Sequence, residues 1–373
     1  MKYFKRIIAL ALSVVLAVAM VGCSADGVKD NGTQAELVQS INETGKYLTR
    51  KIASPKYGDE NAIIALNRST YIDFWHNRTT VYVSNINAMI KNNGYVLGKK
   101  HEVYADGYPD VILSMTTAGI YANLSSSQDL IEGISFDKVV TMGGTLNKVD
   151  ALTALECGKY AMVERGDLTR QDLIDFTMEL QQTDGSFSYA NMGDVTKIEV
   201  TASAVTGLAL TGEKDEIRQA VDNGVKYLIA NISEDDKPTD IVKTIIALNT
   251  VGYDVTDVDG KNVLGYIMAY ARDDGSFSFD KAAKKGNVDD TAWAMLALAS
   301  QYRFTQGMTS IYDMTDIVGG THNQLSPGWM SYLKMMIVFT LFSGVFMLFV
   351  LIRSKFRINK RMAKGLYDEE TKE

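Results

Sequence analysis

A sequence repeat restricts the fold of this chain more than any other feature. The sequence Asp-Gly-Ser-Phe-Ser begins at Asp184 and recurs at Asp274, 90 residues later. The same offset relates Thr201-Ala202 to Thr291-Ala292, so the repeat includes the segment that follows each turn. A repeat with a fixed period predicts a fold built from copies of one supersecondary unit.

A second pattern gives the number of copies. Segments that open with an acidic residue and continue with small and apolar residues begin at Glu60, Asp110, Asp150, Glu199, Asp240 and Asp290. Amphipathic segments precede them at 33–52, 79–93, 126–134, 169–182, 215–230 and 261–272. Amphipathic helices bury one face, whereas helices that are apolar nearly all round are covered on every side. The pattern predicts an all-α fold, a single α6/α6 toroid of alternating outer and inner helices. The inner helices would run parallel.

Two motifs carry a family resemblance. Gln181-x-x-x-Gly185-x-Phe187 is similar to the repeat of squalene and hopene cyclases, and residues 287–292 resemble their acid motif. Over residues 33–302 the chain therefore resembles the α/α-toroid superfamily. That superfamily includes terpenoid cyclases, protein prenyltransferase β subunits, complement-type thioester domains and the cobalamin-binding domain of intrinsic factor. Phe187 and Phe277 stand where the cyclases have tryptophan, and Ala271 replaces the second glutamine.

The turn residues of the repeat have a predicted structural role. Glycine permits positive φ in a tight turn, aspartate bonds its own backbone, and the aromatic residue packs between adjacent hairpins. These positions are Asp184, Gly185, Phe187, Asp274, Gly275 and Phe277.

The acids at the inner-helix starts have two interpretations. Acids near helix N-termini complement the helix dipole, by about 0.3–1 kcal/mol each. In a toroid with parallel inner helices they would also form a ring around one mouth, which could bind a cation or hold a protonated acid. The binding residues predicted on this second interpretation are Glu199, Asp240, Asp289, Asp290 and Trp293.

The resemblance also implies alternatives. In the cyclases the middle aspartate of the acid motif protonates an alkene, and that position is Asp289 here, although Asn287 replaces the first acid. The zinc ligands of prenyltransferases find no counterpart, because His76, His101 and His322 fall outside the predicted inner helices. Cys157-Gly158-Lys159-Tyr160 lacks the thioester glutamine, so Cys157 is interpreted as a buried apolar residue. Intrinsic factor implies that a corrinoid-like ligand is compatible with the fold.

Both ends of the chain carry membrane signals. Residues 1–23 have a basic start, an apolar run and a lipobox-like ending, which predict a signal peptide and a lipid anchor on Cys23; cleavage without lipidation is the alternative. Residues 333–352 predict a transmembrane helix. The basic tail, 353–373, would be cytoplasmic by the positive-inside rule, with residues 303–332 as an extracytoplasmic stalk.

Charge and cysteine content complete the prediction. The formal net charge is -7, and the sequence has no basic stripe of the kind that binds nucleic acid, which argues against a nucleic-acid partner. After Cys23 only Cys157 remains, which excludes an intramolecular disulfide in the exported part and favours a bacterial surface protein. The sequence thus predicts a membrane-tethered toroid that binds a ligand or another membrane or surface protein without catalysis. A cyclase-like enzyme using Asp289 is the alternative, and a structural subunit of a membrane complex is a third.

Overall fold

The computed structural model describes residues 32–71, 75–100, 102–123, 129–212, 214–318 and 353. Over these residues the chain is mostly helical, in agreement with the predicted all-α class. The sheet found among them is a hairpin of β1 (Gly98–Lys99) and β2 (Glu102–Val103), paired antiparallel. None of the helices in the described ranges is long and apolar enough to cross a membrane. The predicted signal peptide, transmembrane helix and tail lie outside these ranges, apart from Arg353.

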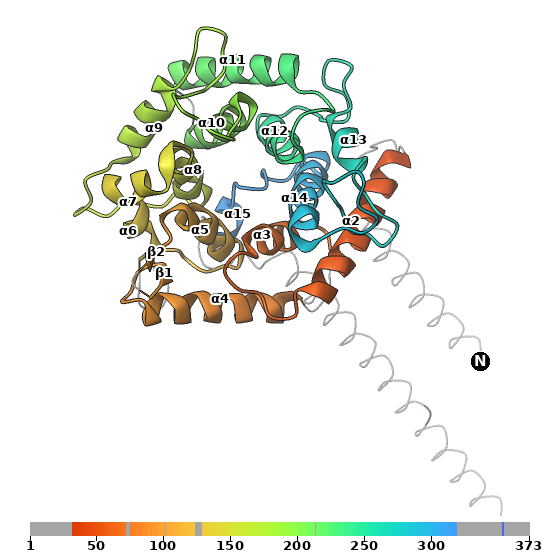
Figure 1. Cartoon of the computed structure of the whole chain (residues 1–373), viewed down its shortest axis with the longest axis horizontal. Helices are drawn as coiled ribbons and strands as arrows, with labels where there is room; N and C mark the ends of the chain where they lie inside the picture. The colour runs from red at the N-terminus through yellow and green to blue at the C-terminus, as the bar shows by residue number, and fades with distance from the viewer. Residues whose placement is uncertain are drawn as a thin grey trace, which may run out of the picture.

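Six helices form an inner ring in chain order (Figure 1). Each contacts the next, and the last contacts the first. Their side chains are mostly buried, as their apolar sequences require. The ring consists of α3 (Glu60–Arg68), α5 (Tyr108–Thr117), α8 (Gly144–Cys157), α10 (Lys197–Thr211), α12 (Pro238–Thr250) and α14 (Val288–Thr305).

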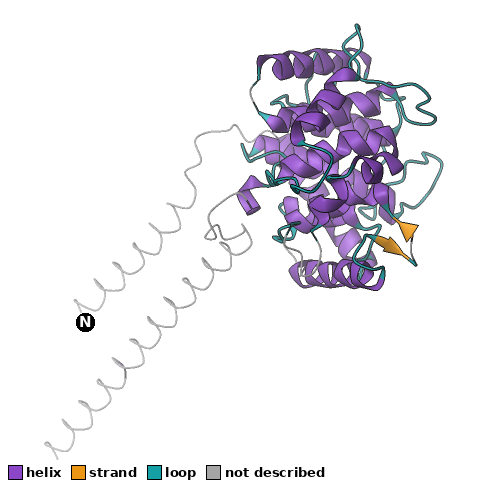
Figure 2. Ribbon diagram, turned by 90° about the vertical axis from the view of Figure 1, so that its left-hand side faces the viewer, coloured by secondary structure: helices purple, strands orange, loops and turns teal. Residues whose placement is uncertain are grey.

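Further helices, some long and some of only one or two turns, surround this ring, as the side view also shows (Figure 2). In chain order they are α2 (Gly32–Lys51), α4 (Trp75–Asn92), α6 (Leu130–Ile134), α7 (Asp137–Met142), α9 (Arg170–Glu179), α11 (Asp215–Asn231) and α13 (Val263–Met268). Helix α4 packs on α3, α9 on α8, and α11 on both α10 and α12. Helix α2 packs on α14, so the first outer helix covers the last inner one.

Contacts between neighbouring inner helices show that they run in the same direction. At the start of α10 the Thr196 hydroxyl donates to Asp240, near the start of α12, at 2.7 Å. At the other end, the Asn249 amide of α12 lies 3.0 Å from the Ser300 hydroxyl of α14. The N-termini of these three helices therefore face one end of the ring, called here the mouth, and their C-termini face the other, called the closed end.

One helix start differs from the prediction. Helix α8 begins at Gly144, so Asp150 lies inside the helix and does not cap it. The helix extends further because α7 runs almost directly into it through Gly143. The Asn147 amide then donates to the Val140 carbonyl across that junction at 2.9 Å.

The two repeat turns have the same geometry. The Asp184 carboxylate accepts from the backbone N–H and hydroxyl of Ser186, at 3.0 and 2.6 Å. Asp274 accepts from Ser276 in the same way, at 3.1 and 2.5 Å. Each following phenylalanine is buried, and its N–H donates to an inner-helix threonine hydroxyl at 2.9 Å.

The glycines of these turns allow close contact with the next outer helix. Gly185 and Gly275 have φ of +86° and +80°. A Cβ at Gly275 would lie 2.6 Å from the Glu43 carbonyl oxygen of α2, and one at Gly185 would lie 2.7 Å from that of Asn223 in α11. Each turn thus joins one hairpin to the next, and the second turn meets the first outer helix.

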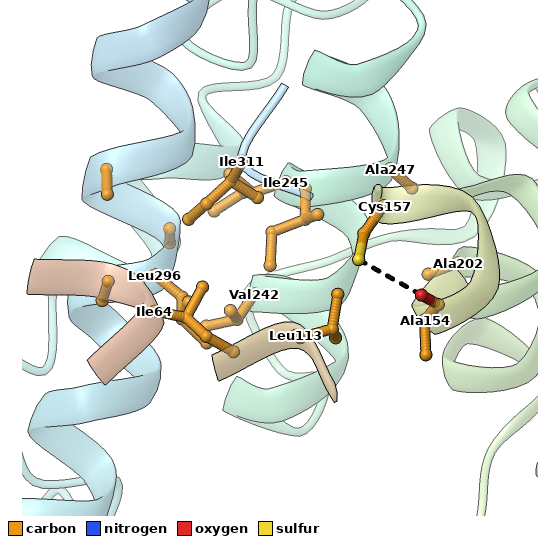
Figure 3. Packing of buried hydrophobic residues seen from close by; sticks show 14 of the residues in the cluster. Ile64, Leu113, Ala154, Cys157, Ala202, Val242, Ile245, Ala247, Leu296 and Ile311 are labelled. Atoms are coloured by element: carbon orange, nitrogen blue, oxygen red, sulfur yellow. Dashed lines mark hydrogen bonds between the residues drawn. The ribbon is translucent and has the colours of Figure 1, made fainter. Parts of the chain in front are cut away.

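The predicted stalk does not begin where the ring ends. Residues 309–318, which include α15 (Thr315–Val318), pack against the closed end, and Ile311 and Met314 are fully buried. Ile311 lies among Ile64, Ile245 and Leu296 of three inner helices (Figure 3). The boundary predicted at residue 302 is therefore wrong, because two apolar side chains and several buried polar contacts beyond it belong to the core. Residues 319–332 lie outside the described ranges.

Candidate functional site

The predicted acids at the inner-helix starts occupy three different environments. Glu199 pairs with Lys243 at 2.9 Å, and the charges of Asp150 and Asp110 also raise the pKa of this lysine. Glu60 and Asp240 are buried in hydrogen-bonded positions between helices. Asp289 and Asp290 belong to the first turn of α14. The predicted ring of equivalent acids is therefore not present: Asp110, Asp150 and Glu199 contribute to one mixed-charge group, and Asp150 does so from within α8.

The group at the mouth consists of Asp110, Asp150, Glu199, Ser203 and Lys243, and is called here the mouth cluster. Its central contact joins Lys243 Nζ to Glu199 Oε1 at 2.9 Å, with side chains 17% and 18% exposed. Lys243 Nζ also lies 3.4 Å from the Ser203 hydroxyl. Burial opposes the charge on Lys243, but the carboxylates of Asp150 and Glu199 outweigh it and raise the pKa of the lysine.

Asp110 is the most perturbed carboxyl of the mouth cluster. Desolvation, followed by the charges of Asp150 and Glu60, raises its pKa to about 7. The residue is nevertheless solvent exposed. Protein atoms therefore surround much of this carboxyl, while water reaches part of the residue. Burial also raises the pKa of Asp150, against the attraction of Lys243.

Glu60 has a structural role at the start of α3. Its side chain accepts hydrogen bonds from the Tyr82 hydroxyl at 2.9 Å and from the Gly58 N–H at 2.8 Å. Tyr82 in turn lies 2.6 Å from the Ser114 hydroxyl of α5. This buried network connects α3, α4 and α5.

Asp240 holds α12 against α10. The residue is 1% exposed, and its Oδ2 accepts from Thr196. Its Oδ1 is buried without a hydrogen-bond partner among the described residues. Burial, the largest effect, raises the pKa of this carboxyl. The predicted binding residue Asp240 is thus enclosed between helices.

The acid motif of α14 forms a helix cap. The Asp290 carboxylate accepts from the Phe279 N–H at 2.8 Å and the Asn287 amide at 2.6 Å. The Asn287 side chain accepts from the Asp290 N–H at 2.8 Å. Asp289 is exposed to solvent, and Trp293 is half-buried against the core. Of the five predicted binding residues, Glu199 alone belongs to the mouth cluster.

Sequence reasoning missed Lys243 of the mouth cluster and did not single out Tyr312. Lys243 could have been found, because it is a charged residue within the otherwise apolar inner segment 241–248. Tyr312 lies in the predicted stalk, where no pattern pointed to a site. Burial, followed by the charges of Asp110 and Asp150, raises the pKa of its hydroxyl.

The closed end of the ring is held by two buried arginines. Arg68 of α3 and Arg303 of α14 are 3% and 5% exposed, and both contact Asp316, at 2.8 and 3.0 Å. Arg68 also donates to the Asp313 carbonyl at 2.7 Å, and Arg303 to that of Thr309 at 2.8 Å. We call residues 309–318 the plug, because these contacts fix it across the closed end.

Two hollows lie elsewhere on the surface. One, of about 270 Å³, separates α9 from α11, and the other, of about 250 Å³, lies beside the plug between α12 and α14. Neither is lined by the mouth cluster. Among the described residues, no three His, Cys, Asp or Glu side chains come together as a metal site.

Comparisons with protein-family models, with curated proteins and with solved structures found no match. The geometry of the ring and of the mouth cluster therefore provides the basis for a functional proposal.

Proposed function

We propose that this chain is a membrane-tethered α6/α6 toroid of the α/α-toroid superfamily that binds a ligand at its mouth and is not an enzyme. The closed sequence of inner-helix contacts and the two equivalent turns support the toroid. The observation that carries the binding proposal is the mouth cluster, in which three carboxylates surround one lysine.

The charges of the mouth cluster favour an organic cation as the ligand. Lys243 is paired with Glu199, which leaves Asp110 and Asp150 without a full positive charge of their own. Carboxylates surrounded by protein act on a ligand through less water than fully exposed carboxylates do, so their attraction is stronger. Ammonium groups can donate to separate oxygens, whereas a metal ion requires its ligands to converge on one point.

Calorimetric titration of the full-length protein with spermidine would test this proposal. We expect binding that weakens as salt is added, because screening reduces attraction between charges. Asp110→Asn or Asp150→Asn should each weaken it about fivefold, which corresponds to about 1 kcal/mol for a partly exposed charge. Asp289→Asn is the matched control, since Asp289 is an exposed acid of α14. Equal effects at all three positions would contradict a site at the mouth cluster.

The alternative of a terpenoid cyclase receives no support from the position of Asp289. Protonating an alkene requires a carboxylic acid in a buried, apolar and hydrogen-bonded setting, and Asp289 is exposed at the first turn of α14. A product assay with squalene and Asp289→Asn would still decide the question directly.

A second candidate is acid–base catalysis at the mouth cluster itself. The observation in its favour is that burial and neighbouring acids raise the pKa of Asp110 to about 7, while Glu199 of the same cluster is paired with Lys243. Two carboxyls held in different environments can act as acid and base. Hydrolysis of a glycoside panel, with activity falling above pH 7 and lost in Asp110→Asn, would favour this candidate over binding alone.

The proposed location is the outer face of a cell membrane. Its support is sequence alone, namely the signal peptide with Cys23 and the apolar segment 333–352 with its basic flank. A partner membrane or surface protein is part of this proposal, because a tethered binding domain without catalysis needs a means to pass on its ligand or signal.

A further inference from the structure

The chain leaves the ring at its closed end. The carbonyl of Val318, the last residue of the plug, accepts from the Tyr121 hydroxyl just beyond α5 at 3.0 Å. The Val318 side chain lies against Gly158, which caps the end of α8 and where a Cβ would be 2.8 Å from the valine. Residues 319–332 then separate Val318 from the predicted transmembrane segment. The C-terminal tether therefore starts beside the C-terminal ends of α5 and α8.

The first outer helix points to the same end. The Tyr47 hydroxyl of α2 donates to the carbonyl of Gly286, shortly before α14, at 3.2 Å, so this part of α2 lies at the mouth. From Tyr47 back to Gly32 the helix covers about 22 Å. Because α2 packs along α14 and runs toward the mouth, Gly32 lies on the side of the closed end. The predicted lipid anchor, Cys23, precedes Gly32 by nine residues.

The lengths of the two linkers limit how the ring can sit on a membrane. An extended chain covers at most about 3.3–3.6 Å per residue, so Gly32 stays within about 30 Å of the Cys23 anchor. The ring is about 27 Å deep along α14, its longest inner helix. With the mouth against the lipid, the residues before Gly32 would have to run almost straight along the wall of the ring. With the closed end against the lipid, both linkers have length to spare.

Two large apolar side chains are exposed on the closed end, across the ring from Val318. Tyr253 follows α12 and is 44% exposed, and Met308 follows α14 and is 43% exposed. They flank the hollow of about 250 Å³ beside the plug, which Gly252 and Met308 line. In the order of the ring, α12 and α14 lie opposite α5 and α8 (Figure 1). The C-terminal tether and the apolar pair thus occupy opposite sides of the same face.

We propose that the closed end rests on the membrane that carries the chain, with Tyr253 and Met308 in contact with the lipid headgroup layer, and that the mouth faces away from the lipid. The inference rests on the proposed location, because it takes Cys23 and residues 333–352 as membrane anchors. A ring held in this way presents the mouth cluster to ligands that arrive from outside the cell.

The exits of the two tethers, and not apolar exposure by itself, favour the closed end. Tyr95 and Met142 are also exposed, in the segments that lead to α5 and α8, so both ends of the ring carry such side chains. Tyrosine suits a headgroup layer, because its ring is apolar and its hydroxyl can remain in water. Asp254 and Asp257 follow Tyr253 and are exposed, so the contact is apolar and does not require an anionic lipid.

Fluorescent reporters at the two ends of α14 would test this orientation. Lys285 is exposed shortly before the helix begins, and Gln306 is exposed directly after it ends. The full-length protein with Lys285→Cys or Gln306→Cys is labelled with bimane and reconstituted in phosphatidylcholine vesicles that carry a nitroxide on the lipid headgroup. The parent protein, in which Cys157 is buried, is the labelling blank. We expect the nitroxide to quench the label at position 306 at least threefold more strongly than the label at position 285.

Matched pairs of substitutions test the contact itself. In the Gln306→Cys protein, Tyr253→Ser with Met308→Ser should reduce the quenching at least twofold. The same change on the mouth side, Tyr95→Ser with Met142→Ser, should leave the quenching unchanged. Equal quenching in the two double variants would overturn the contact of Tyr253 and Met308 with lipid.

Flotation of the vesicles after a carbonate wash separates this inference from the proposed location. If the protein floats with the vesicles, but the two reporters are quenched equally or position 285 is quenched more, the inference is overturned and the location stands. If the protein does not float with the vesicles, the proposed location and the inference are both wrong.

Discussion

Asp110→Asn should stabilise this protein at alkaline pH and leave its stability unchanged at acidic pH. In the folded chain desolvation and neighbouring acids raise the Asp110 pKa from 3.8 to about 7. The folded state therefore holds this proton more tightly than the unfolded state does. The stabilisation that comes from the raised Asp110 pKa is fully present below pH 4 and is lost as pH rises to 7.

The size of this effect follows from the pKa difference. A shift of about three units corresponds to about 4 kcal/mol at 1.36 kcal/mol per unit. Because the Asp110 residue is exposed to water, solvent screening reduces this upper limit, and we expect about 1–2 kcal/mol. Asparagine has nearly the same shape as aspartate and no charge. It therefore removes the loss of stability at high pH without opening a cavity.

Urea unfolding followed by circular dichroism at pH 4, 5.5, 7 and 8 would measure this effect. The difference in unfolding free energy between Asp110→Asn and the parent should be near zero at pH 4 and rise to about 1–2 kcal/mol at pH 8. Asp289→Asn, at an exposed position, is the control and should show a smaller change with pH. A difference that is constant with pH, or a destabilised variant at pH 8, would refute the conclusion that desolvation and neighbouring acids raise the Asp110 pKa.

Three further predictions concern the cluster, the turns and the topology. Lys243→Met should lower the unfolding free energy at pH 7 by about 2 kcal/mol, because it leaves partly buried carboxylates unpaired. The side chain of Lys197 is 47% exposed, so Lys197→Met should cost much less. Equal losses for the two variants would contradict this prediction. Gly275→Ala should lower the unfolding free energy by about 1–3 kcal/mol more than Gly260→Ala does. Both glycines have positive φ, but of the two only a Cβ at Gly275 would meet a backbone oxygen. Equal urea midpoints would show that this close contact has no effect. Protease treatment of intact cells should remove the ring and spare the basic tail, and Cys23→Ala should abolish labelling by a palmitate analogue; a protected ring or persistent labelling would contradict the predicted topology or anchor.

The sequence determined the all-α class, the alternation of amphipathic and apolar helices, and the positions of most inner-helix starts. These features are local, because helical periodicity, the glycine turns at Gly185 and Gly275, and acidic first turns depend on residues a few positions apart. Asp150 shows the limit of this reasoning. Its acid-plus-apolar pattern matched a helix start, but the preceding α7 and Gly143 let α8 begin at Gly144.

Only the tertiary structure decided which acids share a site. Glu199, Asp240 and Asp289 occupy comparable places in the sequence, yet one pairs with Lys243, one is enclosed by Thr196, and one faces solvent. That choice depends on the rotation of each helix about its own axis in the ring. The plug is the clearest case, because Arg68 and Asp316 are 248 residues apart and neither position shows a sequence pattern that predicts their contact. The physical reason is that a buried charge is stable only beside its partner, and that partner is fixed by closure of the whole ring.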